Sequence, residues 1–437
     1  MKRLVFIILF SLMILTPNSR DALGDVNNDG TINVLDIVRI VNIILENDPL
    51  PTDYELWASD VNLDGTTDVS DIILIVQVIL GEDDCPYLYS PCAENLFICC
   101  PDTTSHVLTF EIDTLGAQGM FSWLNDVAVI DENNIWVVGE IHTEETDQFD
   151  STGTWMQPYN AAHWDGEEWE MERIMQPGGY VQSIKCIDYI SEDNIWFGKG
   201  SLPLHWNGMD YYLFTPAEDN YPGGNLISKI YHNSPEDLFI TGYNGSIIHY
   251  DGTSFIQMES GTDVTLKSVT GTGPDNVWVS GHDLDIGINQ QILLHYDGEQ
   301  WNTIIDGPPT WNEIPGMISG VIGGVYTDQP DSVIIVTHLG FYKAPVSTIG
   351  EGYNLFPGID WEGSIKSISG TAGNDIFFGG GIGKLWHYNG ESVYLYNELP
   401  MIGNISSIGA INQIICSVGH NQITHQAFII KGIRSTQ

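Results

Sequence analysis

The chain of 437 residues is poor in basic side chains: 14 lysines and arginines stand against 58 aspartates and glutamates, a formal net charge of −44. The long-range field of so acidic a chain repels polyanions, which excludes nucleic acid and anionic membrane surfaces as expected partners. The charge suits a protein in salty or calcium-bearing surroundings, where counterions screen it. It names no function by itself.

Long apolar runs are also scarce. The prominent one, residues 4–15, follows Lys2 and Arg3 and holds twelve residues, too few to cross a bilayer. A short apolar run behind a basic start is typical of a secretory signal peptide, which we predict at residues 1–22. We therefore expect an extracellular protein without a membrane span.

Cysteines number six. Four of them fall in a linker predicted at residues 83–104: Cys85, Cys92, Cys99 and Cys100. In an exported chain two disulfides are the favoured interpretation. A zinc site is the alternative, although the spacings differ from those of paired Cys-x-x-Cys knuckles. Cys186 and Cys416 lie in strand-like runs and are expected to be buried apolar residues.

The sequence does contain a regular series of oxygen-bearing side chains in GDVNNDGTINVLD, residues 24–36. Oxygen ligands at loop positions 1, 3, 5, 7, 9 and 12, with glycine at position 6, are typical of an EF-hand calcium loop. Gly30 occupies the position of the sharp turn. The predicted ligands are Asp25, Asn27, Asp29, the Thr31 carbonyl, Asn33 and Asp36.

The same pattern returns 35 residues later in SDVNLDGTTDVSD, with Gly65 at the turn. Its predicted ligands are Asp60, Asn62, Asp64, the Thr66 carbonyl, Asp68 and Asp71. Two turns that merely cap helices are the alternative interpretation, but both loops match at every ligand position. Two Ca²⁺ ions are expected, because this hard cation prefers carboxylate and carbonyl oxygens.

Two departures from an ordinary EF-hand are aspartate at position 12 and the lack of a helix before the first loop. This combination resembles the dockerin domain, and the resemblance places such a domain at residues 23–82. It implies a small α-helical module that attaches bacterial enzymes and binding proteins to cohesin scaffolds. By the family pattern, the partner-binding residues are Val34, Leu35, Val69 and Ser70.

The helices predicted after the two loops, VLDIVRIVNIILEN and VSDIILIVQVILG, are apolar almost all round. Such helices must be buried on more than one side, and a module of roughly 60 residues has too little core to cover them. A partner surface is therefore implied. A cohesin-like module is the expected partner, and packing against the rest of the chain is the alternative.

From about residue 105 the sequence consists of repeats. A pattern such as NDVAVIDENNIWVVG recurs seven times, on average about 46 residues apart, which is typical of propellers and other repeat folds. Its apolar anchors are Trp136, Trp196, Phe239, Trp278, Ile334, Phe377 and Ile415. A histidine–aromatic pair and an Asx-Gly turn follow most anchors, as in AAHWDGEEW. These repeats resemble those of bacterial secreted propellers of unassigned chemistry.

Each unit reads as four strands. Because a four-stranded unit of this size cannot bury both faces alone, we predict that the units stack around an axis as an all-β, seven-bladed propeller over residues 105–437. The last unit lacks its fourth strand, and an orphan strand, HVLTFEI at residues 106–112, precedes the first. We expect this strand to complete the last blade and close the ring.

Five histidines share one phase of the repeat: His163, His205, His249, His295 and His387. Separate blades hold them far apart, so a structural role beside the hairpin is expected rather than a metal site.

Insertions fall at residues 140–160 and 282–290, between the second and third strands, and at residues 215–226, 302–318 and 354–364, between units. These two kinds of connection open on one face of a propeller, so ligand contact is expected on this elaborated face. The main ligand-binding candidates are Trp155, Trp311 and Trp361. Further aromatic candidates are Trp123, Tyr159, Tyr221 and Tyr243.

No pair of carboxylates, nucleophile motif or phosphate loop stands out as catalytic. We therefore expect a non-catalytic binding module in an extracellular assembly, linked to polysaccharide recognition or breakdown, with a polysaccharide or another extracellular protein as its ligand. A propeller-type glycoside hydrolase or polysaccharide lyase that carries a dockerin is the alternative, and fold alone does not decide between them.

Overall fold

The structure is a computed structural model. It describes residues 24, 26–27, 33–45, 50–61, 66–80, 103–176, 179–284, 289–312, 314, 317–330, 332–345, 353–354, 364–399 and 403–434. The chain divides into two compact units, residues 1–102 and 103–437. Within the described residues, no helix combines the length and the apolar character needed to cross a membrane.

The described part of the first unit contains helices α1 (Val34–Ile44), α2 (Asp53–Ser59) and α3 (Val69–Leu80). A capping box starts α1: the Asn33 side chain accepts the backbone N–H of the third helical residue, and the Asp36 carboxylate accepts the N–H of Asn33. Thr52 and Glu55 start α2 in the same way.

The core of this unit repeats the duplication seen in the sequence. Its buried members among the described residues are Val26, Ile40, Ala58, Val61 and Ile75. Val26 and Val61 stand 35 residues apart, as do Ile40 and Ile75. Each loop therefore contributes the same two apolar contacts to one shared core.

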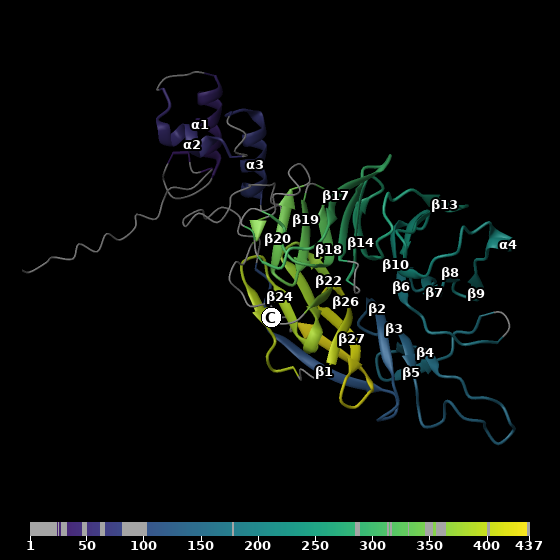
Figure 1. The fold of residues 1–437 in the computed structure, drawn as a ribbon. Coiled ribbons are helices and arrows are strands. Elements are labelled where there is room, and N and C mark those ends of the chain that lie inside the picture. Colours follow the sequence, from purple (N-terminus) through teal and green to yellow (C-terminus); the bar gives the residue numbers. More distant parts are fainter. Residues whose placement is uncertain are drawn as a thin grey trace, which may run out of the picture. The chain divides into compact units, whose positions relative to one another are not determined.

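The second unit is a seven-bladed β-propeller, as the repeats predicted (Figure 1). Blade one holds β2 (Trp123–Asp131), β3 (Asn134–Ile141), β4 (Tyr159–Trp164) and β5 (Trp169–Glu172), and blade two holds β6 (Cys186–Ser191), β7 (Asn194–Lys199), β8 (Leu202–Trp206) and β9 (Tyr211–Leu213). The short helix α4 (Pro216–Asp219) follows blade two. Blade three holds β10 (Ile227–Ser234), β11 (Asp237–Gly242), β12 (Ile247–Tyr250) and β13 (Phe255–Met258), and blade four holds β14 (Leu266–Gly273), β15 (Asn276–Asp283), β16 (Gln290–Tyr296) and β17 (Trp301–Gly307).

The remaining blades follow the same plan. Blade five holds β18 (Ile322–Gln329), β19 (Ser332–Thr337), β20 (Gly340–Pro345) and β21 (Tyr353–Asn354). Blade six holds β22 (Ile365–Ala372), β23 (Asp375–Gly380), β24 (Leu385–Tyr388) and β25 (Val393–Leu395), with the 3₁₀ turn η2 (Gly381–Gly383). Blade seven holds β26 (Gly403–Ile411), β27 (Ile414–Asn421), β28 (Ala427–Arg434) and β1 (Leu108–Leu115).

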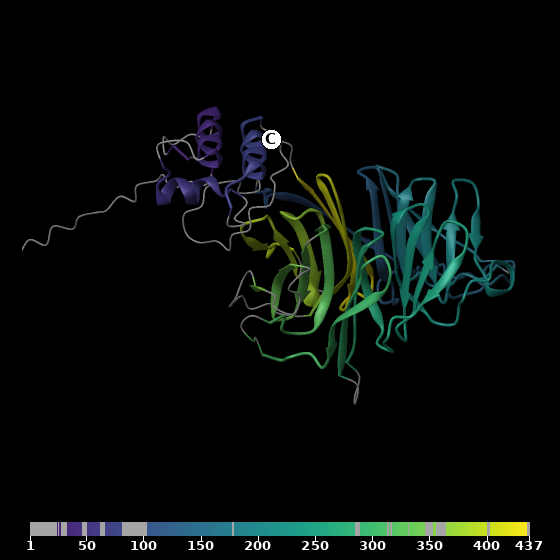
Figure 2. The same ribbon diagram turned by 90° about the horizontal axis from the view of Figure 1, so that it is seen from above.

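The inner strands make the ring, and the two ends of the unit close it. The first strand of each blade contacts the first strand of the next, and β26 of the last blade contacts β2 of the first. The outermost strand of blade seven is β1, which pairs with β28 from Leu108 opposite Arg434 to Leu115 opposite Ala427. Blue β1 lies beside the yellow C-terminal strands in both views (Figure 1, Figure 2). The predicted closure by the orphan strand is confirmed.

Large apolar side chains on the second strand of each blade pack between neighbouring blades. Among the described residues, each gap between blades has its own cluster, and Trp196, Phe239 and Trp278 each enter the cluster shared with the next blade. In blade seven the residue that does so is Cys416, whereas the predicted anchor Ile415 faces back toward blade six. The prediction was off by one residue because it selected the larger apolar side chain.

The five repeated histidines have the structural role that was expected of them. In each case Nε2 meets the side-chain oxygen of the Asn or Asp that begins the second strand, at 2.6–2.9 Å: His163 with Asn134, His205 with Asn194, His249 with Asp237, His295 with Asn276 and His387 with Asp375. Each imidazole also packs on the aromatic anchor of its blade, with ring centroids 4.2–4.7 Å apart. Blades five and seven have lysine at this position, Lys343 opposite Ile334 and Lys431 opposite Cys416.

The Asx-Gly turns between the third and fourth strands explain the second half of the repeat. In blade three, the Asp251 carboxylate accepts the N–H groups of Thr253 and Ser254, while Gly252 has φ +88°. Glycine adopts this left-handed conformation without a steric penalty. The same capping recurs at Asp165 and Asp297.

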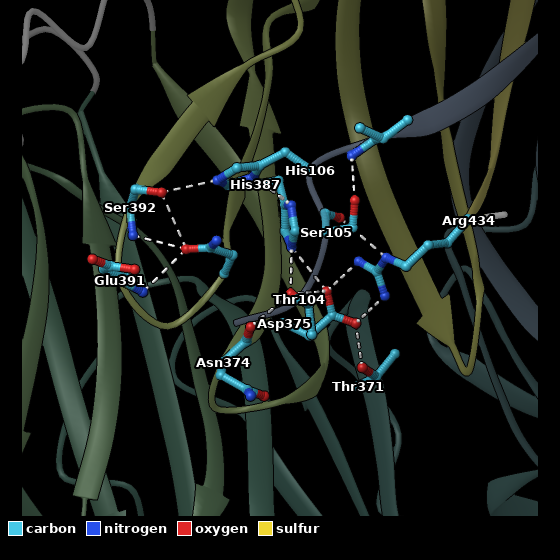
Figure 3. A network of polar contacts seen from close by, with 12 residues as sticks. Thr104, Ser105, His106, Thr371, Asn374, Asp375, His387, Glu391, Ser392 and Arg434 are labelled. Atoms are coloured by element: carbon cyan, nitrogen blue, oxygen red, sulfur yellow. Dashed lines mark hydrogen bonds and ion pairs between the residues drawn. The ribbon is translucent and has the colours of Figure 1, made fainter. Parts of the chain in front are cut away.

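A buried polar network ties the closing segment to blade six (Figure 3). Asp375, 1 % exposed, accepts hydrogen bonds from both terminal guanidinium nitrogens of Arg434 at 2.6 and 3.0 Å and from the Thr371 hydroxyl at 2.5 Å. Burial opposes ionisation of Asp375, but the hydrogen bonds from His387, Arg434 and Thr371 outweigh it and hold the pKa of its carboxyl well below the usual range. Arg434 also donates to the Ser105 carbonyl, so the network reaches the segment before β1.

Candidate functional sites

In the first unit, the residue at position 12 of each predicted calcium loop is a fully buried aspartate. Asp36 accepts the backbone N–H groups of Asn27 and Asn33 at 3.1 and 2.8 Å. Asp71 accepts those of Val61 and Asp68 at 2.7 and 2.8 Å. In each loop the last carboxylate thus accepts two backbone N–H groups, and the donor at position 9 is common to both.

The donor set fits calcium. Asn27, Asn33, Asp36, Asp60, Thr66, Asp68 and Asp71 lie within the described residues, whereas Asp25, Asp29, Thr31, Asn62 and Asp64 lie outside them. Within the described part alone, no group of three or more His, Cys, Asp or Glu side chains is gathered as for a metal ion. Carboxylate, amide and carbonyl oxygens are the ligands that a hard cation takes, and the two loops offer it no softer donor.

The predicted partner-binding residues lie on an exposed apolar surface. Exposed fractions are 60 % for Val34, 57 % for Leu35 and 63 % for Val69. Two further residues, Val38 and Ile73, are 53 % and 54 % exposed and continue the same stripes one turn along α1 and α3. Nothing is described for the Ser70 side chain, which lies outside the described side chains.

The two loop tryptophans of the propeller that the structure describes are solvent-exposed. Trp155 is 47 % exposed and packs edge-on against the exposed Phe149, with ring centroids 5.1 Å apart. Trp311 is 59 % exposed and lies 5.4 Å from the His338 ring. Each packs on residues near its own loop, and no ring contact joins the two among the described residues. Trp361 lies outside the described residues.

The further aromatic candidates differ in their surroundings. Tyr221 is only 2 % exposed and packs against Phe255 in the core between blades two and three, so it is no surface candidate. Tyr159 lies under the guanidinium of Arg173. Tyr243, 42 % exposed, lines a cavity at the inner strands.

The four clustered cysteines, Cys85, Cys92, Cys99 and Cys100, also lie outside the described residues. Cys186 and Cys416 are free and buried, as expected, and burial raises the pKa of each thiol to about 12. Neither thiol is therefore a reactive nucleophile at neutral pH.

Sequence reasoning missed the cavity itself, which has a volume of about 540 Å³ and is lined by the beginnings of the inner strands. In six blades the pairing of the first strand with the second is interrupted by one extra residue at the same place, a β-bulge. The bulge residues are Asn125, Ser228, Lys267, Gly323, Lys366 and Ser406. Lys185 holds the corresponding place in blade two, directly before β6.

These positions form what we call the bulge ring: Asn125, Lys185, Ser228, Lys267, Gly323, Lys366 and Ser406. All but one carry a polar side chain, and lysine recurs in blades two, four and six. Since each inner strand begins where the chain arrives from the previous blade, the ring lies toward the elaborated face. The sequence signal was the recurrence of SIKCI, TLKSV and SIKSI before three anchors.

The residues that directly follow the bulge positions in blades one and three, Asp126 and Lys229, neutralise each other. Asp126, 2 % exposed, receives the Lys229 ammonium at 2.6 and 2.7 Å, the Ser407 hydroxyl at 2.6 Å and the Ile187 N–H at 3.0 Å. These contacts join blades one, two, three and seven across the inner strands. Asp126 is therefore a structural carboxylate.

Comparison with known proteins identifies a domain within the first unit. Residues 23–80 match the profile of the dockerin type I domain. The chain therefore carries a dockerin type I domain at residues 23–80, and dockerin domains of this type bind calcium and dock onto cohesins. None of the curated proteins matches the chain.

Solved structures match the propeller. The chain is similar to YCF48 bound to a D1 peptide (TM-score 0.52, 12 % identity, covering 75 % of this chain and 97 % of that one). It is also similar to the WD40 β-propeller domain of Doa1 (TM-score 0.52, 13 % identity, 76 % and 98 %). A third is catalytically inactive virginiamycin B lyase from Staphylococcus aureus with quinupristin (TM-score 0.51, 12 % identity, 74 % and 99 %). At such low identity these likenesses show the fold alone.

Proposed function

We propose that this chain is an extracellular docking protein whose calcium-loaded dockerin attaches a non-catalytic propeller to a cohesin-type module, and that the propeller binds a polysaccharide. The observation that carries the docking half is the exposed apolar surface of Val34, Leu35, Val38, Val69 and Ile73. A monomeric domain of this size gains nothing from leaving so many branched apolar side chains in water, whereas a partner surface would bury them.

In this proposal residues 1–22 are the signal peptide and residues 83–104 a disulfide-containing linker between the dockerin and the propeller. Two calcium ions, one in each loop, fix the beginnings of α1 and α3. The apolar side chains of Val34 and Leu35 in the first loop and of Val69 in the second then face outward at the start of each helix. Calcium thereby orders the surface that the cohesin contacts.

We expect the double variant Leu35→Asp and Val69→Asp to lose calcium-dependent binding to a cohesin module, by at least about 100-fold, because two charges must be desolvated in an apolar interface. Binding is measured by calorimetry with recombinant cohesins. Leu56→Asp on α2, where Leu56 is 45 % exposed, is the matched control and should bind normally. Equal losses in both variants, or no calcium-dependent cohesin binding at all, would contradict the docking proposal.

The binding half of the proposal rests on the elaborated face of the propeller. It displays the exposed Trp155 and Trp311, and indole rings stack on the apolar faces of sugars. The single carboxylate among the described residues that line the cavity, Asp126, is committed to Lys229. A glycosidase needs two carboxyl groups on either side of the scissile bond, and this arrangement therefore favours binding over hydrolysis.

Trp155→Ala and Trp311→Ala together are expected to weaken binding of the protein to a polysaccharide by about tenfold or more, since each stacked ring contributes roughly 1 kcal/mol. Affinity electrophoresis against a panel of soluble polysaccharides measures this. Met209→Ala, 79 % exposed in the hairpin turn of blade two, is the control for loss of an exposed apolar side chain. Newly formed reducing ends in the wild-type reaction would replace the binding proposal with the hydrolase alternative.

A further inference from the structure

The bulge ring concentrates positive charge in a chain that has little of it. The described residues that line the cavity include four lysines, Lys185, Lys229, Lys267 and Lys366, and one carboxylate, Asp126, which together carry a net charge of three positive. The chain as a whole carries −44. Four of the 14 lysines and arginines of the chain line this one cavity, which makes the local potential positive in an otherwise acidic protein.

Lys185 and Lys366 of the ring differ from Lys229 in their partners. Asp126 neutralises Lys229, whereas among the described residues no carboxylate forms an ion pair with Lys185 or Lys366. Burial and the neighbouring charge of Lys185 both lower the pKa of Lys366. Burial, Lys267 and Lys366 together lower the pKa of His282 in the cavity wall to about 4, so this imidazole is neutral at pH 7. Lys185 and Lys366 thus repel each other across the cavity wall.

β-Bulges in the backbone place these side chains around the cavity. A bulge adds one unpaired residue to a strand and redirects its side chain, and here six bulges at one level put their extra residues around a single cavity. Between the lysines, the ring has the hydroxyl groups of Ser228 and Ser406 and the amide of Asn125. The ammonium and hydroxyl groups of the ring form an array that can donate hydrogen bonds to several oxygens at once.

We propose that the bulge ring binds the carboxylate groups of an acidic oligosaccharide, through Lys185, Lys267 and Lys366, with the neighbouring hydroxyls contacting its sugar hydroxyls. This inference rests on the proposed polysaccharide binding and names the class of sugar. The volume of about 540 Å³ is in the usual range for small-ligand sites. A bound anion relieves the repulsion between the lysines, which is a free-energy gain available only to an anionic ligand.

The lining favours a sugar over an acidic peptide. Serine and threonine side chains, among them Ser268, Ser367 and Thr270, supply hydroxyls deeper in the same cavity. Peptides are generally recognised through sheet edges or apolar side-chain pockets, whereas most of the described residues that line this cavity have polar side chains. Hydroxyl-rich walls match the polyol character of a sugar.

The acidity of the rest of the molecule does not prevent anion binding. At about 0.15 M salt the Debye length is about 8 Å, so carboxylates on the outer strands of the blades are screened from the channel. The lysines act at contact distance within a partly enclosed cavity, where the effective dielectric is lower than in water. The local charge therefore outweighs the global one.

The test is calorimetric titration of the full-length protein, in calcium buffer at pH 7, with tetragalacturonate and with its fully methyl-esterified form. The two ligands share the same sugar chain, and esterification replaces each carboxylate with a neutral methyl ester. We expect binding of the acid and at least tenfold weaker binding of the ester. Raising the salt from about 0.05 M to about 0.5 M should weaken only the acid.

The matched variants are the triple replacements Lys→Gln and Lys→Arg at positions 185, 267 and 366. Gln should reduce affinity for the acid at least tenfold, and Arg, which keeps the charge, should restore most of it. Preferential binding of the ester, or equal affinity in wild type and the Gln variant, would overturn the inference, as would tighter binding of a polyglutamate peptide than of the sugar acid. Neutral polysaccharides that still bind through Trp155 and Trp311 in that case would leave the proposed function standing.

Discussion

Removing calcium with a chelator is expected to abolish the α-helical circular-dichroism signal of the protein while leaving its β-sheet signal unchanged. The helices α1, α2 and α3 belong to the dockerin, and the propeller contributes almost only strands, so one spectrum of the whole chain separates the two units. Asp36 and Asp71 are fully buried carboxylates that accept backbone N–H groups of their loops. Without a cation, the carboxylates of each loop converge without charge compensation, and the core of a module of roughly 60 residues is too small to offset this.

The sharper test keeps the chain intact and replaces one ligand at a time. Asp36→Asn and Asp71→Asn should each weaken calcium binding at least tenfold and lower the temperature at which the helical signal is lost. Asp165→Asn, in an exposed hairpin turn of the propeller, is the control and should change neither quantity. A helical signal that survives in excess chelator would show that packing alone holds the dockerin together.

The features that the sequence revealed are those that repeat with a fixed spacing. The calcium loops recur after 35 residues, and each anchor comes with its histidine and its Asx-Gly turn. Such periodicity reflects local chemistry: His163 bonds Asn134 within one blade and stacks on Trp136, so all three residues fall in one repeat. The whole fold follows once these units are counted, including the completion of blade seven by β1.

The features that it concealed depend on contacts between repeats. Lysine occupies the bulge ring in only three blades, and a β-bulge leaves no apolar period to read. The Asp126–Lys229 pair joins residues 103 apart, and the Asp375–Arg434 pair joins residues 59 apart. Tyr221 resembled a surface aromatic in a loop sequence, yet it packs on Phe255 in the core. Each of these features depends on where the residue lies in the folded propeller, which its residue type alone does not indicate.

Replacing Asp375 with asparagine is expected to destabilise the propeller toward the lower end of about 3–5 kcal/mol, the cost of breaking a buried ion pair. Asparagine keeps the acceptor for His387, as Asn134 and Asn276 do in their own blades. It leaves the Arg434 guanidinium, whose side chain is 11 % exposed, without its carboxylate. The free energy of unfolding is measured by denaturant titration of tryptophan fluorescence.

Asp237→Asn in blade three is the matched control, because Asp237 makes the same contact with His249 at 2.6 Å and no ion pair with an arginine among the described residues. The control should lose less than about 1 kcal/mol. Arg434→Gln should resemble Asp375→Asn, and the double variant should cost little more than either single one, because both remove the same interaction. Additive losses would show that the pair does not act as a unit in closing the ring.

The same closing network should make stability fall as the pH drops from about 6.5 to about 4. His106 Nδ1 lies 2.8 Å from His387 Nδ1. Nε2 of His387 faces Asp375 and therefore carries its proton, so Nδ1 of neutral His387 accepts from His106. Burial first, and then the charges of His387 and Arg434, lower the pKa of His106 to about 4.

Because its ordinary pKa is 6.5, His106 takes up a proton in the unfolded chain well before it does so in the folded protein. Stability is therefore complete above pH 6.5 and is lost progressively down to about pH 4. His106→Gln should flatten this part of the profile, while the contribution of His282, whose pKa is also about 4, remains. An unchanged profile in His106→Gln would place the acid sensitivity outside the closure.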